Sequence, residues 1–426
     1  MVRSFLRRYL AISLGTRLVV AFVAGAAAGL VLGPSASVLS PVSDLLTLAL
    51  RVLAVPAVAI YILYALSDVG LRHLGRYGVP VLALFIGWST LAAALGGAVS
   101  FVVSRLAHLA SSGAWDPRLA PPAQAAGASG GPPVILGADS AVAMAVIVAV
   151  PLALVVAAGR ERGDLAWAHM MHRLGGRAAG LLAATIRAVM EYAPFGIFAL
   201  AALTFGTSHS AVATSLPLVL ASVYLAHLGL GLALLTGVGL RRGRPLAFLA
   251  QSREALLTAL ATGSSAATVP VEIRTADTLL RVAPPVAGVA IGVGATLCKV
   301  GTTAFLGALV VWAGVLAGTP ASLPWMLQAL AATTVAGMLT PPISGGGFVM
   351  FGFVALHLGL PASLVPLLIG IPFVGKLNTP LNALGRLTCA CLASPGCRMA
   401  AGAAPDRVDS EPDSPSARVD APGSPC

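Results

Sequence analysis

The chain has 426 residues, of which 58% are hydrophobic and only 10% charged, and its mean hydropathy is +0.92. A soluble domain carries roughly 25% charged residues, so this chain lacks the polar surface that would face water on all sides. Its net charge of +11 does not indicate nucleic-acid binding, because the arginines stand in short clusters between apolar runs. We therefore expect a multi-pass protein of the cell (plasma or inner) membrane, with the lipid bilayer as its surroundings and no nucleic-acid partner.

The first part of the chain predicts six full-length membrane helices. Basic residues open the sequence, and the following apolar run contains no small-residue cleavage site, so we expect residues 1–16 to be a cytoplasmic N-terminus and not a signal peptide. A helix needs about 20 apolar residues to cross a bilayer. Segments of that length cover residues 17–33, 43–67, 79–105, 132–158, 178–206 and 213–239.

Basic residues alternate between the connections of these helices. Arginines follow the second, fourth and sixth predicted helices, at Arg72, Arg76, Arg160, Arg162, Arg173, Arg177, Arg241, Arg242 and Arg244. The connections at 33–50 and 207–215 contain none. Because Lys and Arg concentrate in cytoplasmic loops, this alternation predicts that the N- and C-termini are both cytoplasmic.

After the sixth helix the apolar segments become shorter. Residues 250–280 and 325–359 each contain two half-length apolar pieces around a turn rich in Gly, Ser, Thr or Pro. Each alone could be an ordinary helix interrupted by glycine. A pair of interrupted segments, however, is typical of inverted-repeat transporters, in which half-helices meet near the middle of the membrane. We therefore expect two re-entrant helical hairpins.

The remaining segments complete the expected fold. A seventh helix at 283–317 is interrupted at the sequence CKVGTT, and an eighth covers 361–393. From Ser394 the sequence is rich in Pro, Ser and Asp, which predicts a disordered cytoplasmic tail at 394–426. The fold class is thus all-α integral membrane, with eight transmembrane helices plus two hairpins.

The five cysteines do not predict a metal centre. Their spacing fits neither a zinc site nor an extracellular disulfide framework. Cys389, Cys391 and Cys397 could hold a metal, but small apolar packing is the stronger interpretation. Motifs of hydrolytic enzymes and phosphate-binding loops are absent from the sequence. We expect no enzyme activity, no metal site and no cofactor.

Five stretches resemble one family, the dicarboxylate/amino-acid:cation symporters with the glutamate/aspartate transporter fold. They are YAPFGIFAL at 192–200, TGSSAATVPV at 262–271, GATLCKVGTTAF at 294–305, TPPISGGG at 340–347 and NTPLNALGRLT at 378–388. The resemblance covers roughly residues 15–393. It implies inverted repeats, a homotrimer, a scaffold at 17–67 and 132–206, and a mobile transport part at 79–105 and 213–393.

The resemblance also implies a set of substrate-binding residues: Ser264, Ser265, Thr302, Gly345, Gly346, Thr379 and Asn382. Hydroxyls and free N–H groups at the N-terminus of a half-helix attract carboxylates. The alternative is that each hydroxyl only bonds its own helix backbone. The glycines would suit a mobile gate, because glycine permits unusual backbone angles.

The chain departs from the family at positions that bind cations and substrate. Cys298, Lys299 and Val300 stand where the family has Asn-Met-Asp, and Arg386 stands where it has a cation-binding Asp. Gly375 and Asn378 replace its substrate-facing Asp and Arg. By resemblance, the remnants of the cation sites are Ser89, Gly294, Cys298 and Val300.

The charge pattern supports this departure without reference to any family. Between Asp277 and Asp406 the sequence has no Asp or Glu, yet it contains Lys299, Lys376 and Arg386. A charge at the centre of a membrane helix costs about 2.5–3.5 kcal/mol or more, so such residues usually face an interior with a partner. Sodium prefers hard-oxygen ligands, carboxylates above all. The absence of carboxylates from this part of the sequence therefore argues against ordinary sodium symport.

Two interpretations give the basic residues a function. Lys299 and Arg386, with Lys376 as a third candidate, could supply fixed charge where cations would otherwise sit and so stabilise an anionic substrate. Lys299 could instead load and release a proton, which a desolvated lysine can do and an arginine cannot. The alternatives are that Lys299 extends to an aqueous edge, that the site has decayed, and that Arg386 and Lys376 are interfacial anchors.

The sequence therefore predicts a secondary active transporter, symporter-type, that works by alternating access. Its expected substrates are small organic anions such as dicarboxylates, or acidic or neutral amino acids, with sodium or a proton as the possible coupling ion. The alternative is a non-pumping protein of the same fold, an anion pore or a ligand sensor. Pro341 and Pro342 would suit that alternative, because they stiffen the entry to the second hairpin.

Overall fold

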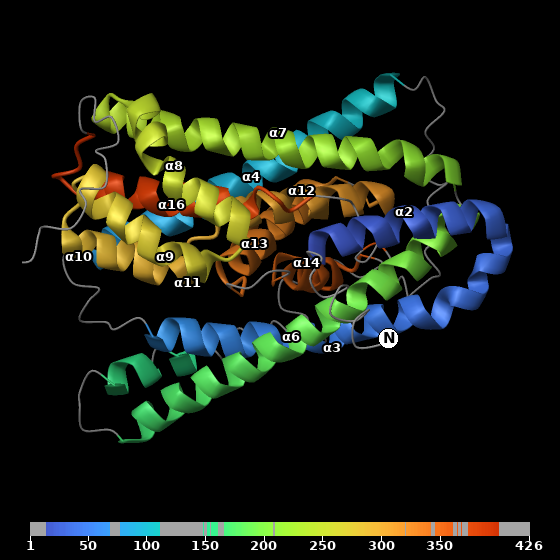
Figure 1. Cartoon of the computed structure of the whole chain (residues 1–426), viewed down its shortest axis with the longest axis horizontal. Coiled ribbons are helices and arrows are strands. Elements are labelled where there is room, and N and C mark those ends of the chain that lie inside the picture. The colour runs from blue at the N-terminus through green and yellow to red at the C-terminus, as the bar shows by residue number, and fades with distance from the viewer. Residues whose placement is uncertain are drawn as a thin grey trace, which may run out of the picture.

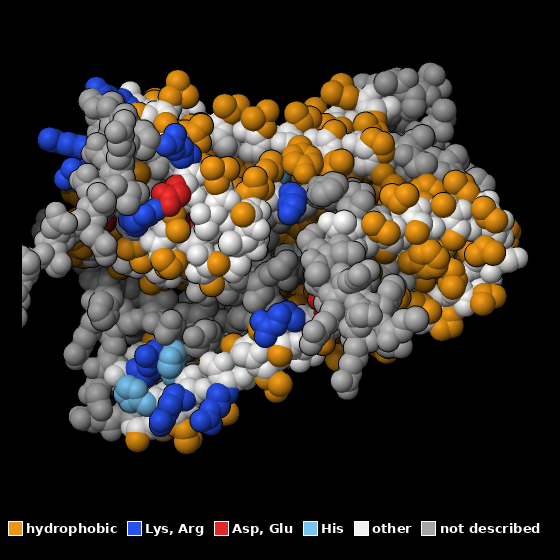
Figure 2. Space-filling model, viewed as in Figure 1, with side chains coloured by type: hydrophobic (Ala, Val, Ile, Leu, Met, Phe, Trp, Pro, Cys, Tyr) orange, Lys and Arg blue, Asp and Glu red, His pale blue; other side chains and the backbone are white. Residues whose placement is uncertain are grey.

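A computed structural model describes residues 14–68, 77–110, 148, 151–153, 155–160, 166–207, 209–319, 321–341, 346–360, 364, 368 and 374–399. Within these ranges the chain forms helices and turns but no strand, which confirms the all-α class (Figure 1). Five helical segments there are long and apolar enough to cross a membrane: Thr16–Leu46, Gly78–Ala107, Ala166–Leu203, Leu216–Arg242 and Pro284–Leu316. Figure 2 shows many hydrophobic side chains on the face in view, as expected where lipid replaces water.

The first group of helices packs around one long helix. It comprises α2 (Leu14–Leu32), η1 (Gly33–Leu39), α3 (Ser40–Asp68) and α6 (Ala166–Thr207), and both α2 and α3 contact α6 (Figure 1). The α2–α6 approach depends on glycine, because a Cβ on Gly25 would lie 2.3 Å from the Phe198 carbonyl oxygen. An ion pair between Arg17 and Glu191 also joins the two helices.

The predicted start of the fifth helix is wrong. The sequence predicts a helix at 178–206, but α6 begins at Ala166 and includes Arg173 and Arg177, which we expected in a connection. Long basic side chains can extend into water from an exposed helix face as well as from a loop. The predicted fourth helix, 132–158, lies mostly outside the described residues.

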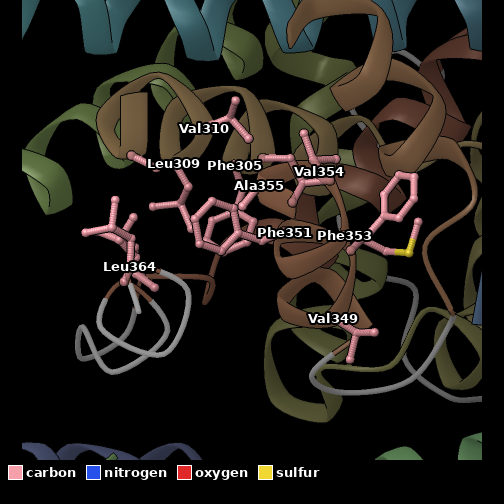
Figure 3. Packing of buried hydrophobic residues seen from close by; sticks show 14 of the residues in the cluster. Phe305, Leu309, Val310, Val349, Phe351, Phe353, Val354, Ala355 and Leu364 are labelled. Atoms are coloured by element: carbon pink, nitrogen blue, oxygen red, sulfur yellow. The ribbon is translucent and has the colours of Figure 1, made fainter. Parts of the chain in front are cut away.

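The second group surrounds a buried helix, α12 (Val300–Leu316), which contacts α4 (Gly78–Ala110), α7 (His209–Arg242), α13 (Leu323–Met338), α14 (Gly346–His357) and α16 (Asn378–Ala393). All its residues from Val300 to Gly314 are buried. Figure 3 shows Phe305 and Leu309 of α12 in the same core as Phe351 and Val354 of α14. The Trp312 Nε1–H donates to Ser222 Oγ of α7 at 2.8 Å, so the buried indole is also satisfied.

Two pairs of short helices occupy the segments expected to form hairpins. The first pair is α8 (Pro245–Thr262) and α9 (Ser265–Arg274), followed by the π-helical turn η3 (Thr275–Leu279). Gly263 joins them with φ of +61°, a left-handed conformation that favours glycine. The second pair is α13 and α14, which pack against each other; the connection at 342–345 lies outside the described residues.

The seventh segment is broken as predicted. It consists of α10 (Pro284–Ala287), the π-helical turn η4 (Gly288–Val293), α11 (Gly294–Leu297) and then α12. Cys298 (φ −94°, ψ 89°) and Lys299 (φ −119°, ψ 44°) leave the helical region and form the break. The break exposes the first N–H groups of α12 to partners from other helices.

The C-terminal cysteines correct two expectations. Cys391 and Cys397 form a disulfide, in place of the small apolar packing that we predicted for them. The sequence could not reveal this pairing, because it depends on the turn that follows α16. Ser394, Cys397 and Met399 are buried, so 394–399 belongs to the folded domain and not to a disordered tail. Arg242 at the end of α7 fixes this turn by donating to the Cys391 carbonyl at 2.8 Å.

Candidate functional site

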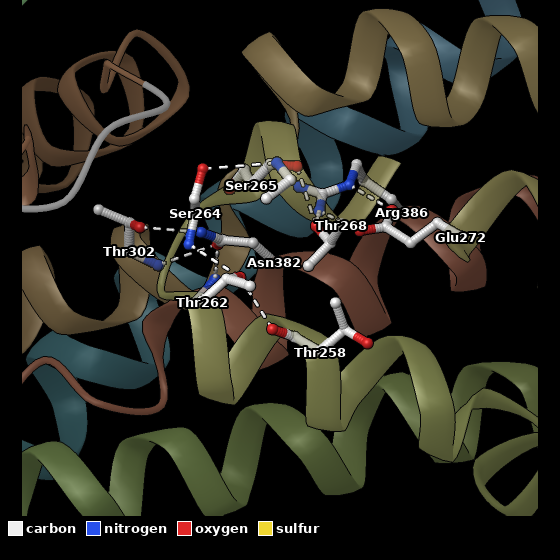
Figure 4. A network of polar contacts seen from close by, with 11 residues as sticks. Thr258, Thr262, Ser264, Ser265, Thr268, Glu272, Thr302, Asn382 and Arg386 are labelled. Atoms are coloured by element: carbon white, nitrogen blue, oxygen red, sulfur yellow. Dashed lines mark hydrogen bonds and ion pairs between the residues drawn. The ribbon is translucent and has the colours of Figure 1, made fainter. Parts of the chain in front are cut away.

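The broken seventh segment meets the start of α16 through Asn382. Its Oδ1 accepts hydrogen bonds from the N–H groups of Gly301 (2.8 Å) and Thr302 (3.2 Å), and its Nδ2 donates to Thr302 Oγ1 at 3.0 Å (Figure 4). The first N–H groups of a helix have no partner within that helix, and here a side chain from another helix supplies one. Two of the predicted binding residues, Thr302 and Asn382, are thus brought into direct contact.

Arg386 has an acidic partner that the sequence reasoning missed. Its Nε donates to Glu272 Oε2 at 2.7 Å, its Nη2 to the other carboxylate oxygen, and Nη2 also to Thr268 Oγ1 at 3.4 Å (Figure 4). The side chains of Arg386 and Glu272 are both 0% exposed. The pair joins α9 to α16, which contradicts the alternative that Arg386 is an interfacial anchor. The sequence did contain a signal for this partner, namely a glutamate within the short, mostly apolar segment VPVEIR.

Lys299 is buried at the break, with 1% of its surface exposed, which contradicts the alternative that it extends to an aqueous edge. The charges of Arg386 and Glu272 both act on Lys299, so the three residues form one cluster. Among its described residues the cluster has one carboxylate, paired with Arg386, and two basic side chains.

The predicted remnants of the cation sites are filled by side chains. A Cβ on Gly294 would lie 3.1 Å from both Cγ and Cδ of Arg386, so the arginine stem packs directly on this glycine. Cys298, Val300 and Ser89 are fully buried, and Ser89 Oγ makes no hydrogen bond within the described part of the chain. At the positions that the resemblance assigns to cation binding, the structure thus has an arginine stem and a buried valine, neither of which offers an oxygen ligand.

The tip of the first helix pair places both predicted serines at the N-terminus of α9. Ser264 is the N-cap residue, and its Oγ accepts from Ala267 N at 3.4 Å. Local capping, the alternative to a binding role, thus accounts for this hydroxyl. Ser265 is 4% exposed and begins the helix. The binding roles of both serines stay predictions.

The remaining predicted residues lie at the edge of the cluster or outside it. Gly346 begins α14, and Thr379 is half-buried in the first turn of α16. Lys376 lies in the turn before α16 with an exposed side chain, apart from the buried pair of Lys299 and Arg386. Gly345 lies outside the described residues.

His227, in the middle of α7, is a further site residue that the sequence reasoning missed. It is 1% exposed, and its Nε2 lies 3.2 Å from the Gly301 carbonyl oxygen. The side-chain amide of Asn378 is its other polar neighbour. A histidine in the middle of a long helix that is mostly apolar was the available signal in the sequence.

Comparison with known proteins shows which family the chain resembles over nearly its whole length. The model of the sodium:dicarboxylate symporter family matches residues 14–395. The C4-dicarboxylate transport protein of Anaeromyxobacter sp. (strain K) is 26% identical over 399 residues, which cover 88% of each chain. An excitatory amino acid transporter of Caenorhabditis elegans is 26% identical over 208 residues, 47% of this chain and 41% of its own length. Excitatory amino acid transporter 3 of Mus musculus is 29% identical over 205 residues, 47% of this chain and 39% of its own length.

The alignments with the animal proteins thus cover less than half of their length, whereas the bacterial alignment covers nearly the whole of both chains. The family match spans all the described helices that build the site, from α2 to α16. This is a family of membrane transporters and not of enzymes. The chain belongs to the sodium:dicarboxylate symporter family.

Proposed function

We propose that this protein is a secondary active transporter that moves a small organic anion or amino acid by alternating access and does so without sodium. The substrate class follows the names of the relatives, a C4-dicarboxylate transport protein and excitatory amino acid transporters. The main support for sodium independence is the fully buried ion pair between Arg386 and Glu272.

The Arg386 guanidinium, which is part of the protein, supplies the positive charge that a bound cation would otherwise supply from solution. A buried glutamate needs a positive partner, and the guanidinium provides one with three polar contacts between α9 and α16. Because this charge cannot leave, it keeps the two helices joined at any sodium concentration. A sodium ion entering the same place would meet the fixed positive charge of Arg386.

Lys299 is our candidate for a coupling group. Its complete burial beside Arg386 favours the role, since a lysine in such surroundings can give up its proton while the guanidinium keeps its charge. Loading a proton on Lys299 together with a substrate of net charge −1 would keep the net charge of the cluster constant. Transport would then follow a proton gradient.

The finer architecture belongs to the same proposal. We infer that α8–α9 and α13–α14 are the two re-entrant hairpins, that eight helices span the membrane, and that three copies assemble. Figure 2 shows basic side chains at the end where α6 begins and α7 ends, and α7 carries Arg241 and Arg242 in its last turn. This end would face the cytoplasm, together with both termini.

Uptake into liposomes that contain the purified full chain tests the proposal. Labelled succinate, malate, aspartate and serine would be offered with and without sodium, and with and without a pH gradient. We expect accumulation that is indifferent to sodium and driven by protons. Accumulation that requires sodium would overturn the sodium-independent mechanism. Passive flux without accumulation would identify a pore, and binding without flux a sensor, and either would overturn transport.

A further inference from the structure

The end of α16 and the turn after it, residues 391–399, are fastened to elements from elsewhere in the chain; we call them the C-terminal clasp. Arg242, in the last turn of α7, donates to the carbonyl oxygens of Cys391 at 2.8 Å and Pro395 at 3.3 Å. It also donates to the Ser394 carbonyl oxygen. The last carbonyl groups of a helix have no partner within that helix, so the guanidinium satisfies this end of α16 and fixes it against α7.

The rest of the clasp holds the segment that leaves the first helix pair. The N–H of Ala283, the N-cap residue of α10, donates to Ser394 Oγ at 3.1 Å. The Arg398 N–H donates to the Leu280 carbonyl oxygen at 3.0 Å. Leu280 directly follows η3, so this bond joins the exit of the α8–α9 pair to the chain beyond α16. It is a second fastening between these units, besides the buried ion pair described above.

The disulfide brings Arg398 to Leu280. Cys391 is fixed at the end of α16, and its partner Cys397 directly precedes Arg398. Without the covalent link, a turn hydrogen bond and the burial of Cys397 and Met399 would hold these last residues in place. A disulfide removes much of the conformational freedom of the loop that it closes. We therefore expect the bond to Leu280 to open far more often when the disulfide is reduced.

The position of this disulfide indicates a role beyond stability. It lies at the end of α7 that carries Arg241 and Arg242, the end that we assign to the cytoplasm. Cellular thiols keep cytoplasmic cysteines reduced, and a disulfide that forms there is usually transient and serves catalysis or redox sensing. Cys397 is also within reach of a small thiol once the turn opens, because its neighbours Gly396 and Arg398 are exposed.

We propose that Cys391 and Cys397 form a thiol–disulfide exchange site through which the cellular redox state controls the first helix pair. The thiolate of a small thiol, of the glutathione class, attacks Cys397 Sγ; the Sγ–Sγ bond breaks, and Cys391 leaves as a thiolate that takes up a proton. A second thiol then attacks the mixed disulfide and releases Cys397. The products are two protein thiols and one small disulfide, and the same steps in reverse close the clasp.

The reduced protein is the faster transporter in this scheme. This part of the inference rests on the proposed transport function and on the proposed cytoplasmic end. α9 and α16 enclose the buried pair of Glu272 and Arg386, with Lys299 in the same cluster. A substrate that enters or leaves beside this cluster requires movement between the two helices, and the closed clasp restrains α9 at its exit. Reduction removes that restraint, and oxidation restores it.

Trypsin cleavage after Arg281 tests the structural step. Arg281 is exposed and directly follows Leu280. The full chain in lipid nanodiscs would be equilibrated in buffers of reduced and oxidised glutathione, and alkylation with mass spectrometry would give the fraction of open disulfide. We expect cleavage at least about fivefold faster in the reduced form, because cleavage follows the population of the locally opened state. Equal cleavage of the reduced and oxidised forms would overturn the proposal.

Uptake and two variants test the regulatory step. In liposomes with the same glutathione buffer on both sides, we expect uptake at least about threefold faster in the reduced form, since a restrained movement limits the rate. Cys397→Ser should behave as the reduced form in every buffer, and Cys391→Ser serves if that variant does not fold. Cys389→Ala is the matched control: Cys389 is a buried free thiol of the same helix, outside the disulfide, and its loss should leave the redox response intact.

The outcomes separate this inference from the proposed function. A chain that keeps both thiols open in every buffer, or a redox response that persists in Cys397→Ser, would overturn the exchange site. Uptake that is equal in the two forms, or faster in the oxidised form, would overturn the regulatory role and leave transport standing. Redox-dependent cleavage without any uptake would reject the transport function and retain the exchange site.

Discussion

Arg386 and Glu272 are 114 positions apart in the sequence and form an ion pair in which neither side chain is exposed. Each belongs to a different structural unit, α16 and the first helix pair. A buried pair of this kind adds little net stability compared with a well-packed apolar pair, but loss of one partner is costly. Contact between these two units therefore requires both charges, because the loss of either one leaves the other buried without a partner.

Glu272→Gln should destabilise the protein by about 3–5 kcal/mol, because it leaves the Arg386 guanidinium buried without a counter-charge. Denaturant unfolding of the purified chain in detergent, followed by tryptophan fluorescence, measures the effect. A double variant, Glu272→Leu with Arg386→Met, should recover most of the loss, since no buried charge then remains.

Glu254→Gln is the matched control for that substitution. Glu254 forms an ion pair with Arg274 in which both side chains are more than half exposed, at 56% and 60%. An exposed pair contributes about 0–1 kcal/mol, so this variant should unfold like the unmodified chain. Equal effects of the two glutamine variants would show that the Glu272 pair is not desolvated as described.

Lys299→Met should keep or raise stability while abolishing proton-driven uptake. The substitution removes one of two buried basic groups that share a single carboxylate, and replacing buried charges by apolar residues is often stabilising by about 1–4 kcal/mol. Unfolding and liposome uptake would be measured on the same preparation. A stable variant that still accumulates substrate down a pH gradient would eliminate Lys299 as the coupling group.

Asn382→Leu should cost about 1–2 kcal/mol, the usual effect of removing a helix cap, because the N–H groups of Gly301 and Thr302 lose their acceptor. Asn382→Asp keeps an acceptor at the N-terminus of α12 and adds favourable charge there. Aspartate should therefore be tolerated better than leucine. Thermal unfolding of the two variants would show the order, and the reverse order would contradict the capping role.

Gly301→Ala should destabilise by about 1–3 kcal/mol through overpacking. Its Cβ would lie 2.4 Å from the Asn378 carbonyl oxygen and 2.7 Å from Leu381 Cβ, and the backbone of α16 cannot move away cheaply. Gly288→Ala is the control, since nothing lies within 4 Å of its Cβ. That variant should be neutral or gain up to about 1 kcal/mol from helix propensity. Similar melting temperatures for both variants would contradict the close α12–α16 approach.

Much of the fold could be predicted from the sequence because membrane helices are encoded locally. An apolar run long enough to cross a bilayer needs no information about its neighbours, and α4 and α7 lie close to their predicted positions. The break at Cys298 and Lys299 was also evident locally, from a lysine and two glycines in an apolar segment. The start of α6 could not be predicted locally, because an exposed basic helix and a basic loop have similar composition.

The sequence by itself determined that this chain enters a membrane, where its helices break, and that its later half has basic residues with no acid beside them. Only the tertiary structure decided that Glu272 pairs with Arg386, that Asn382 caps α12, and that His227 reaches Gly301. Helix formation depends on hydrogen bonds within a few residues of each other. The partner of a buried polar group, in contrast, depends on which helices pack together, and that is settled by the whole chain.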